Sequence, residues 1–305
     1  MKIAITTSSF ARFSEAPLQL LRQEHIDYVL NPLGRKLTEN ETIDLLQDCV
    51  AVAAGTEPLT ARVMDALPGL KVISRCGTGM DNVDMEAARA RGIAVRNTPD
   101  GPTQAVAELT LGLALDLMRQ VSRMDRELRS GVWKKRMGNL LGGKRLGIVG
   151  MGRIGRAVAD IFTPLGVQVA FNDPVSCCGD YPCMPVEELL GWADILSLHC
   201  SMTGGECSLF TAEHLRRMKR GSWVINVARG GLIDEQALYE ALADGHLAGA
   251  AVDVFGNEPY TGPLSSLDNV ILTPHIGSYA KEARIRMETD TIANLIDALR
   301  AAGVK

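Results

Sequence analysis

The chain is 305 residues long, which is about the length of two domains. Hydrophobic residues make up 46% of it, enough for two cores, and the net charge is −4 with a sequence pI of about 5.8. This acidic balance provides no electrostatic attraction to nucleic acid or to an anionic membrane, so we expect neither as a partner. No apolar run approaches the ~20 residues that a membrane span needs, and the first residues carry no signal-peptide pattern. We therefore predict a cytoplasmic protein.

The cysteines, seven in all, are an odd number scattered through a long chain. Such usage is typical of reduced thiols in an intracellular protein rather than of a disulfide framework. Cys177, Cys178 and Cys183 lie close together, but their spacing is not that of a zinc site, and no histidine pair accompanies them. We therefore expect no metal site.

Strand-like and helix-like segments alternate through the first third of the chain. This alternation predicts a parallel sheet covered by helices on both faces. The expected strands are residues 2–7, 26–30, 50–54, 70–74 and 93–96, and the expected helices are 16–24, 40–47, 60–66 and 85–91.

A long apolar segment follows at residues 105–129. Leu109, Leu113, Leu117 and Val121 recur at helical spacing, which predicts one continuous helix. The segment is more apolar than a lone surface helix needs, and Gly131-Val132-Trp133 extends it. We expect this region to help form a homodimer.

The most informative motif of the chain is Gly150-Met151-Gly152-Arg153-Ile154-Gly155. It follows a predicted buried strand, residues 144–149, and precedes an amphipathic helix predicted at residues 156–165. Glycines at these positions let the backbone approach a pyrophosphate, and the helix N-terminus supplies N–H groups to bind it. The motif predicts a dinucleotide-binding unit.

A second strand, residues 167–172, ends in Asp173. A carboxylate at this position binds the hydroxyl groups of the adenosine ribose and would repel the extra phosphate of NADP. Asp173 therefore favours NAD as the cofactor.

Four more strands are expected at residues 195–199, 223–228, 248–254 and 270–273, and a last helix at 281–301. The turn-rich segment 97–102 and the segment 277–279 are the predicted crossovers between two domains. We expect residues 1–98 with 280–305 to form a discontinuous substrate domain, and residues 99–279 to form the cofactor domain. Two crossovers close together predict a hinge beside a ligand-binding cleft.

Polar side chains follow the ends of three late strands: Arg229, Glu258 and His275. The carboxyl ends of parallel strands line the ligand crevice of an open sheet, so all three side chains are expected to face one site. A guanidinium can bind a carboxylate through two hydrogen bonds and polarise the adjacent carbonyl. An imidazole can exchange the hydroxyl proton near neutral pH, and a carboxylate bonded to it would hold its orientation. Each residue alone has an ordinary structural interpretation, and the prediction depends on their joint placement.

Several stretches of the chain, in this order, resemble the D-isomer-specific 2-hydroxyacid dehydrogenase family, and within it the D-3-phosphoglycerate dehydrogenase-like members. The resemblance covers residues from about 70 to the end, whereas the first 65 residues carry little family signal. The matching stretches are Arg75-Cys76-Gly77-Thr78-Gly79-Met80-Asp81-Asn82-Val83-Asp84, Asn97-Thr98-Pro99, Leu146 to Gly155, Asn226-Val227-Ala228-Arg229-Gly230-Gly231-Leu232-Ile233-Asp234, Ala251-Val252-Asp253-Val254-Phe255 and Pro274-His275-Ile276-Gly277.

The resemblance implies an α/β fold with two doubly wound parallel-sheet domains, a Rossmann cofactor domain and a flavodoxin-like substrate domain. It implies Arg229, Glu258 and His275 as the catalytic set. The implied cofactor-binding residues are Thr78, Gly150, Gly152, Arg153, Ile154, Gly155, Asp173, Cys200, Val227, Ala228, Arg229, Asp253, His275, Gly277 and Ser278. The implied substrate-binding residues are Cys76, Gly77, Thr78, Gly79, Arg229 and His275.

One of these expectations also follows from local chemistry. Glycine-rich turns make anion-binding nests of backbone N–H groups, so residues 77–79 are suited to a substrate carboxylate.

The chain departs from the phosphoglycerate-type members in the turn after the third strand. Those members tend to carry basic residues there, whereas this turn is Gly55-Thr56-Glu57-Pro58. Glu57 would repel a phosphate if it faced the cleft, and the candidates to compensate are Arg75 and the basic run 134–136 of a partner subunit. Because the chain stops at Lys305, we also expect no appended serine-sensing domain.

The leading interpretation is an NAD-dependent D-2-hydroxyacid dehydrogenase, phosphoglycerate dehydrogenase-like, that transfers hydride between nicotinamide and C2 of a small 2-hydroxy or 2-oxo acid. The alternative within the family is a hydroxypyruvate or glyoxylate reductase. An alternative of another class is an NAD-responsive corepressor-like binding protein, although the chain has no evident extra interaction segment. A methyltransferase would also use a glycine-rich loop and an acid, but Arg229, Glu258 and His275 would have no role in it.

Overall fold

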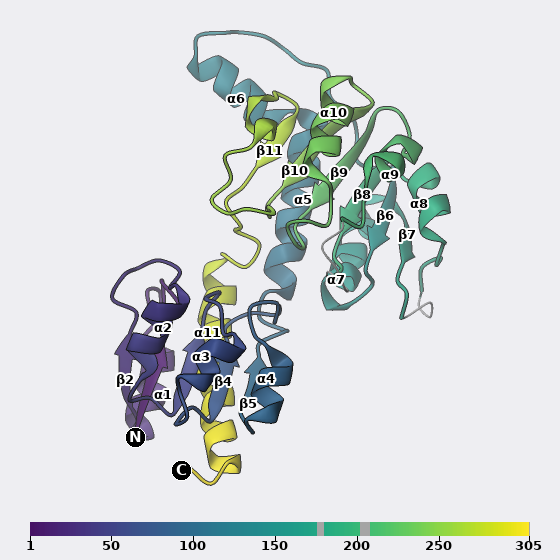
Figure 1. Cartoon of the computed structure of the whole chain (residues 1–305). Coiled ribbons are helices and arrows are strands. Elements are labelled where there is room, and N and C mark those ends of the chain that lie inside the picture. Colours follow the sequence, from purple (N-terminus) through teal and green to yellow (C-terminus); the bar gives the residue numbers. More distant parts are fainter. Residues whose placement is uncertain (176–179, 202–207, 305) are drawn as a thin grey trace. The chain divides into compact units, whose positions relative to one another are not determined.

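The computed structural model describes residues 1–175, 180–201 and 208–304, which form two compact units, each with its own sheet (Figure 1). Unit 1 comprises Met1–Pro102 and Ser278–Lys305, and unit 2 comprises Thr103–Gly277. The junctions therefore lie at 102/103 and 277/278, a few residues from the predicted 98/99 and 279/280.

Unit 1 contains five parallel strands in the order β2-β1-β3-β4-β5. This is the flavodoxin-like order, and its direction reverses between β1 and β3. The strands are β1 (Lys2–Ile5), β2 (Asp27–Leu30), β3 (Ala51–Ala54), β4 (Val72–Arg75) and β5 (Ala94–Asn97). The helices are α1 (Ala16–Gln23), α2 (Glu39–Leu46), α3 (Ala61–Asp65), α4 (Met85–Ala90) and α11 (Lys281–Ala301).

Both faces of this sheet are covered, as the apolar composition of its strands predicts. Ile3 and Ile5 of β1 lie in a core with residues of α1 and α11, such as Leu21 and Leu295. Ala4, on the opposite face, lies in a second core with residues of α2 and α3.

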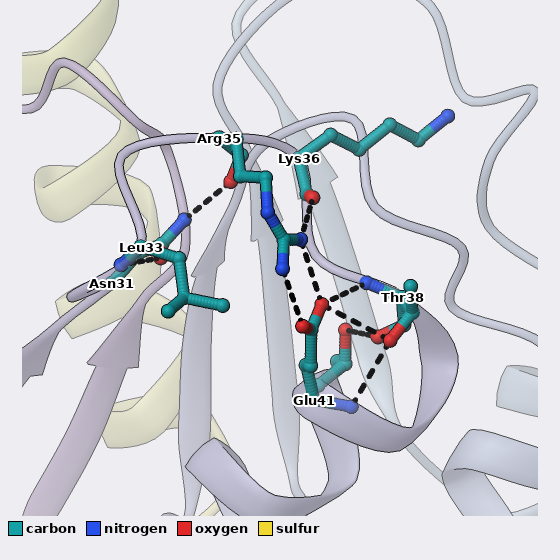
Figure 2. Close-up of polar contacts among 7 residues, drawn as sticks. Asn31, Leu33, Arg35, Lys36, Thr38 and Glu41 are labelled. Carbon is teal, nitrogen blue, oxygen red and sulfur yellow. Dashed lines mark hydrogen bonds and ion pairs between the residues drawn. The ribbon is translucent and has the colours of Figure 1, made fainter.

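The start of α2 shows how local sequence fixes an element boundary (Figure 2). Thr38 and Glu41 form a capping box, in which the Thr38 hydroxyl accepts the Glu41 N–H and the Glu41 carboxylate accepts the Thr38 N–H at 2.9 Å. Arg35 donates to both oxygens of the same carboxylate. These hydrogen bonds, with that from Arg35 the largest, lower the pKa of Glu41 to about 2.

Unit 2 contains six parallel strands in the order β11-β10-β9-β8-β6-β7. A single parallel bridge between Phe171 and Cys183 lies beyond β7, where the third strand of a full Rossmann sheet would pair. The strands are β6 (Arg145–Val149), β7 (Gln168–Asn172), β8 (Ile195–Leu198), β9 (Ser222–Asn226), β10 (Leu247–Val252) and β11 (Val270–Leu272). The helices are α5 (Thr103–Arg119), α6 (Val121–Arg129), α7 (Arg153–Phe162), α8 (Val186–Trp192), α9 (Ala212–Arg217) and α10 (Glu235–Ala243), with 3₁₀ turns η1 (Thr163–Leu165) and η2 (Pro263–Ser266).

Two cores sandwich this second sheet. Val224 of β9 packs in a core with residues of α8, α9 and α10, whereas Ile225 packs on the other face with residues of α5 and α7. The prediction of two doubly wound parallel-sheet domains is thus confirmed. Within the described residues, we find no helix with the length and apolarity to cross a membrane.

The prediction of one helix over residues 105–129 is wrong. The helix divides into α5 and α6 at Gln120, whose φ of +53° places it in the left-handed region. Asp116 stabilises the break because its carboxylate accepts the backbone N–H of Ser122 at 2.8 Å and also accepts the Ser122 hydroxyl. A side chain that accepts a backbone N–H competes with the hydrogen bonds of the helix, and the spacing of apolar residues does not reveal such competition.

The expectation of uniformly reduced thiols also needs correction. Cys183 is disulfide-bonded, whereas Cys49, Cys76 and Cys200 are free. An odd total of cysteines does not preclude a bridge. Cys177, Cys178 and Cys207 lie outside the described residues, so the cysteine cluster is only partly within them. Among the described residues, there is no group of three or more histidine, cysteine, aspartate or glutamate side chains arranged to hold a metal.

Candidate active site

The glycine-rich turn connects β6 to α7 and is shaped by close backbone approach. Gly150 has a φ of +93°, and a Cβ there would lie 2.7 Å from the backbone nitrogen of Cys200. Only glycine therefore allows the carboxyl ends of β6 and β8 to lie this close together. Cys200, predicted to line the cofactor, is thereby placed beside the turn.

The N-terminus of α7 fits a pyrophosphate group. Gly152 is the N-cap, with no side-chain cap and with nothing within 4 Å of where a Cβ would stand. The helix begins at Arg153, so Arg153 and Ile154 supply its first backbone N–H groups beside this open space. Such N–H groups and the helix dipole favour an anion, so these residues fit the cofactor that the sequence predicts.

Asp173 lies against the same turn. One oxygen of its carboxylate accepts the Met151 N–H at 2.8 Å, and the other accepts the Val175 N–H at 2.8 Å. Burial raises the pKa of the Cys200 thiol, and the charge of Asp173 adds to that rise. Asp173, Cys200 and the glycine turn therefore form one locus at the carboxyl end of the sheet.

Asp253 organises the loop that carries His275. Its buried carboxylate accepts the Thr273 hydroxyl at 2.6 Å and the N–H groups of Ile276 and Gly277 at 2.8 Å each. The carbonyl oxygen of Asp253 accepts the His275 N–H at 2.9 Å. Burial raises the pKa of Asp253, and the hydrogen bonds from Thr273, Ile276 and Gly277 oppose that rise. This loop holds His275 at a φ of +53°, a conformation that an L-residue adopts only when its surroundings fix it.

Glu258 and His275 meet as the sequence predicts. His275 Nδ1 lies 3.0 Å from Glu258 Oε2, and Glu258 Oε1 accepts the Phe255 N–H at 3.1 Å. The His275 side chain is 49% exposed and that of Glu258 39%, so the imidazole is accessible to a small molecule.

The Arg229 turn packs directly on the loop that carries Glu258. A Cβ at Gly230 would overlap the carbonyl oxygen of Phe255, so only glycine permits this contact. Asn226 stabilises the turn through two hydrogen bonds. Its Nδ2 donates to the carbonyl oxygen of Arg229 at 2.9 Å, and its Oδ1 accepts the Ala228 N–H at 3.1 Å. The three predicted residues thus lie on loops that follow the neighbouring strands β9, β10 and β11. The loop that carries Arg229 is in contact with the loop that carries Glu258.

Some supporting residues had no role assigned from the sequence. Glu235, the first residue of α10, accepts the Gly256 N–H at 2.8 Å and so anchors the Glu258 loop. Thr273 and Asn226 shape the other two loops. Of these three residues, Asn226 alone lies in a stretch that carries the family resemblance. That resemblance was the only signal in the sequence that pointed to one of them. Val227 and Ala228 are buried next to the Arg229 turn.

The predicted substrate turn of unit 1 follows β4. The Gly77 N–H is not available to an anion because it donates to the Thr98 hydroxyl at 2.8 Å, and the Cys76 N–H donates to Ala54 O. Of the anion-binding nest expected at residues 77–79, only the N–H groups of Thr78 and Gly79 are therefore candidates to bind a carboxylate. Asn97 Nδ2 donates to the Thr78 carbonyl oxygen at 2.7 Å. The Thr78 side chain is exposed, with its hydroxyl 3.5 Å from the carbonyl oxygen of Pro99.

The structure also places two charged residues that bear on whether a substrate phosphate could bind. Glu57 is buried and does not project from its turn. Arg136 forms an ion pair with Glu127 of its own chain.

Comparison with known proteins agrees with this geometry. Residues 111–277 match the NAD-binding domain of the D-isomer-specific 2-hydroxyacid dehydrogenases, and this segment holds the glycine turn and all three catalytic candidates. The expectation of NAD is confirmed at the level of this domain.

The whole chain also has close relatives. It is 39% identical to the D-3-phosphoglycerate dehydrogenase of Pongo abelii over 87% of this chain and 52% of that protein. The chain thus spans about half the length of the phosphoglycerate dehydrogenases it matches. It is 38% identical to the glyoxylate reductase of Korarchaeum cryptofilum over 90% of this chain and 87% of that protein.

The fold comparison extends over almost the whole chain. The crystal structure of the TT0316 protein from Thermus thermophilus superposes with a TM-score of 0.92 at 38% identity, covering 99% of this chain and 97% of the other. The chain therefore belongs to the D-isomer-specific 2-hydroxyacid dehydrogenase family.

Proposed function

We propose that this protein is an NAD-dependent oxidoreductase that interconverts a small D-2-hydroxyacid and its 2-oxoacid. The observation that carries the proposal is the hydrogen bond between His275 and Glu258, on loops of the unit that matches the family's NAD-binding domain. An exposed imidazole oriented by a carboxylate is the arrangement that general acid–base catalysis at a hydroxyl group requires.

Each residue of the set has a distinct task. Arg229 binds the substrate carboxylate and polarises the neighbouring C2 carbonyl, because a guanidinium offers two parallel N–H donors. His275 donates a proton to the carbonyl oxygen during reduction and accepts it back during oxidation. Glu258 is a positioning residue that keeps Nδ1 occupied and so fixes the orientation of the ring.

The cofactor residues are proposed from the same geometry. Gly150, Gly152 and the first N–H groups of α7 would hold the pyrophosphate, and Asp173 the adenosine ribose. When bound, the nicotinamide supplies or accepts the hydride. Asp253 shapes the loop that places His275 and Gly277, and we assign it to the nicotinamide end of the site.

The substrate is proposed only as a class. A phosphoglycerate dehydrogenase-like activity has the support of the mammalian relative, and a glyoxylate or hydroxypyruvate reductase that of the archaeal relative, which the chain matches nearly end to end. A specific observation, the burial of Glu57 beside the substrate turn, favours the second candidate and is developed below.

The deciding experiment is reduction of a panel of 2-oxoacids by the purified protein, followed as loss of NADH absorbance. We expect turnover of at least one short oxoacid with NADH. Binding of NADH without turnover of any member would instead support the NAD-responsive binding protein.

We also propose a homodimer, formed through α6 and the segment after it. Several large apolar side chains of this region are strongly exposed in the single chain: Leu128, Val132, Trp133, Met137 and Leu140. Trp133 is 81% exposed, an exposure that association would reduce. Sedimentation or light scattering at micromolar concentration should give the mass of a dimer, and a monomer would contradict the proposal.

A further inference from the structure

A polar network spans the carboxyl edge of the unit 1 sheet. The strand order reverses between β1 and β3, and ligands of open α/β sheets bind outside the carboxyl ends of the strands at such a point. Asn31, after β2, donates to the carbonyl oxygen of Thr6 at 2.9 Å, and the Thr6 hydroxyl donates to Glu57 Oε1 at 2.5 Å. Asn31 also holds the loop that leads to α2 (Figure 2). The network thus links the ends of β2, β1 and β3.

Glu57 is the centre of this network and is only 1% exposed. Besides the Thr6 hydroxyl, the Gly55 N–H lies 3.2 and 3.1 Å from its two oxygens. These partners are donors, as an ionised carboxylate requires. Burial raises the pKa of Glu57, whereas these hydrogen bonds and the charge of Arg75 oppose that rise.

Arg75 fixes a positive charge at the proposed substrate turn. It ends β4, and its Nη1 donates to the carbonyl oxygen of Cys76 at 2.6 Å. Its guanidinium also lies over Gly77, where a Cβ would overlap it. The charge of Arg75 opposes the rise in the pKa of Glu57, so the two side chains are electrostatically coupled.

We propose that Glu57 determines specificity within the proposed dehydrogenase function: by balancing the charge of Arg75, it makes the turn Cys76–Gly79 select 2-oxoacids with an uncharged group on C3 over those with a phosphate there. A phosphate monoester carries a charge of about −1.5 to −2, so an unbalanced arginine would attract it strongly. With Glu57 ionised, the combined charge of Glu57 and Arg75 is zero. Salt screens buried charges much less than exposed ones, so the influence of Glu57 persists at physiological ionic strength.

The test compares hydroxypyruvate with its 3-phosphate, which differ only in that group, as substrates with NADH. We expect the unmodified protein to have the higher kcat/KM for hydroxypyruvate. Glu57→Gln keeps an oxygen that can accept from Thr6 and Gly55 but removes the charge. It should lower the KM for the 3-phosphate about 10-fold, equivalent to about 1.4 kcal/mol. The KM for hydroxypyruvate should change much less.

A matched control is Asp48→Asn, which removes one exposed negative charge before β3, at the opposite end of that strand. It should leave both KM values unchanged. If circular dichroism shows that Glu57→Gln is unfolded, Glu57→Met removes the same charge without leaving a buried amide to be satisfied. The substrate preference of the unmodified protein is a separate test that needs no variant.

The outcomes distinguish this proposal from the function on which it rests. A preference of the unmodified protein for the 3-phosphate, or an unchanged ratio of the two KM values in Glu57→Gln, would overturn the role of Glu57 alone. Failure of the unmodified protein to reduce any 2-oxoacid would overturn the dehydrogenase function and this proposal with it.

Discussion

Glu258 holds His275 from one side only: Glu258 Oε2 lies 3.0 Å from Nδ1 of the imidazole, while Oε1 accepts the Phe255 N–H. Since Nδ1 is occupied, Nε2 is the ring atom left to exchange a proton with a substrate. The carboxylate cannot rotate away without losing its bond to the backbone of residue 255. The predictions about the proton-transfer step follow from this geometry.

Replacement of His275 by alanine removes the proposed acid and base. Because general acid–base catalysis contributes roughly 10²–10⁴-fold, His275→Ala should lower kcat at least ~10²-fold in both directions. NADH affinity, measured by fluorescence titration, should stay near that of the unmodified protein. The control is His25→Ala, an exposed histidine of unit 1. Near-normal turnover by His275→Ala would require another proton donor and would remove His275 from the mechanism.

The variant Glu258→Gln keeps the side-chain shape but not its charge. The imidazole then loses the carboxylate that orients it through Nδ1, so kcat for oxoacid reduction should fall while the KM for the oxoacid changes little. The fall in kcat at the optimum should be smaller than for His275→Ala. An unchanged kcat would mean that Glu258 does not orient His275, and a rise in KM alone would mean that it acts only through the fold of its loop.

Arg229→Lys tests geometry at constant charge. An ammonium group cannot form two parallel hydrogen bonds with a carboxylate, so kcat/KM should fall about 10-fold or more although the charge is kept. The comparison is Arg217→Lys, since Arg217 forms an exposed ion pair with Glu213. If both variants kept full kcat/KM, two-point binding by Arg229 would be excluded.

Asp173→Ser should change cofactor preference. The unmodified protein should strongly prefer NADH to NADPH, because the carboxylate beside Met151 would repel a 2′-phosphate. Without it, affinity for NADH should fall and the preference should narrow, as measured by kcat/KM for both cofactors. Glu187→Ala, which removes an exposed charge from α8, should leave the preference unchanged. Equal efficiency of the unmodified protein with NADH and NADPH would contradict the assignment.

Glu41 gives a prediction about acid stability. Its hydrogen bonds lower its pKa to about 2 from an ordinary value of 4.5. A lowered carboxyl pKa contributes stability that is fully present above the ordinary value and is lost as the pH falls toward the lowered one. Glu41→Gln should therefore have a lower Tm than the unmodified protein at pH 7, and the difference should shrink between pH 4.5 and 2. A Tm difference that stayed constant over this range would show that the charge has no part in it.

The sequence was sufficient to predict the features set by local periodicity. The alternation of apolar segments gave both sheets, and the last helix was predicted at 281–301, the bounds that α11 has. The glycine motif was recognisable because its residues are adjacent in the chain. The strand-end positions of Arg229, Glu258 and His275 followed from the rule that parallel strands share one carboxyl edge.

What the sequence did not reveal depends on contacts between distant segments. The Gly77 N–H is taken by Thr98, a bond that exists only once β4 and β5 are paired. The sequence left open whether Glu57 faces the cleft, and its buried position involves a hydrogen bond from Thr6, which follows β1. The break at Gln120 is stabilised by the Asp116 side chain, whose hydrogen bonds to Ser122 helical periodicity does not reveal.

The contact at Gly230 has a consequence for any redesign of this enzyme. Because the Arg229 turn rests on the carbonyl oxygen of Phe255 with no room for a methyl group, the two loops must move together. A displacement of the Arg229 turn therefore shifts the loop that supports the imidazole, so substrate anchoring and proton delivery are coupled through this backbone contact. Directed evolution of substrate range has more freedom at the turn after β3, which belongs to unit 1 and so is not part of these two loops.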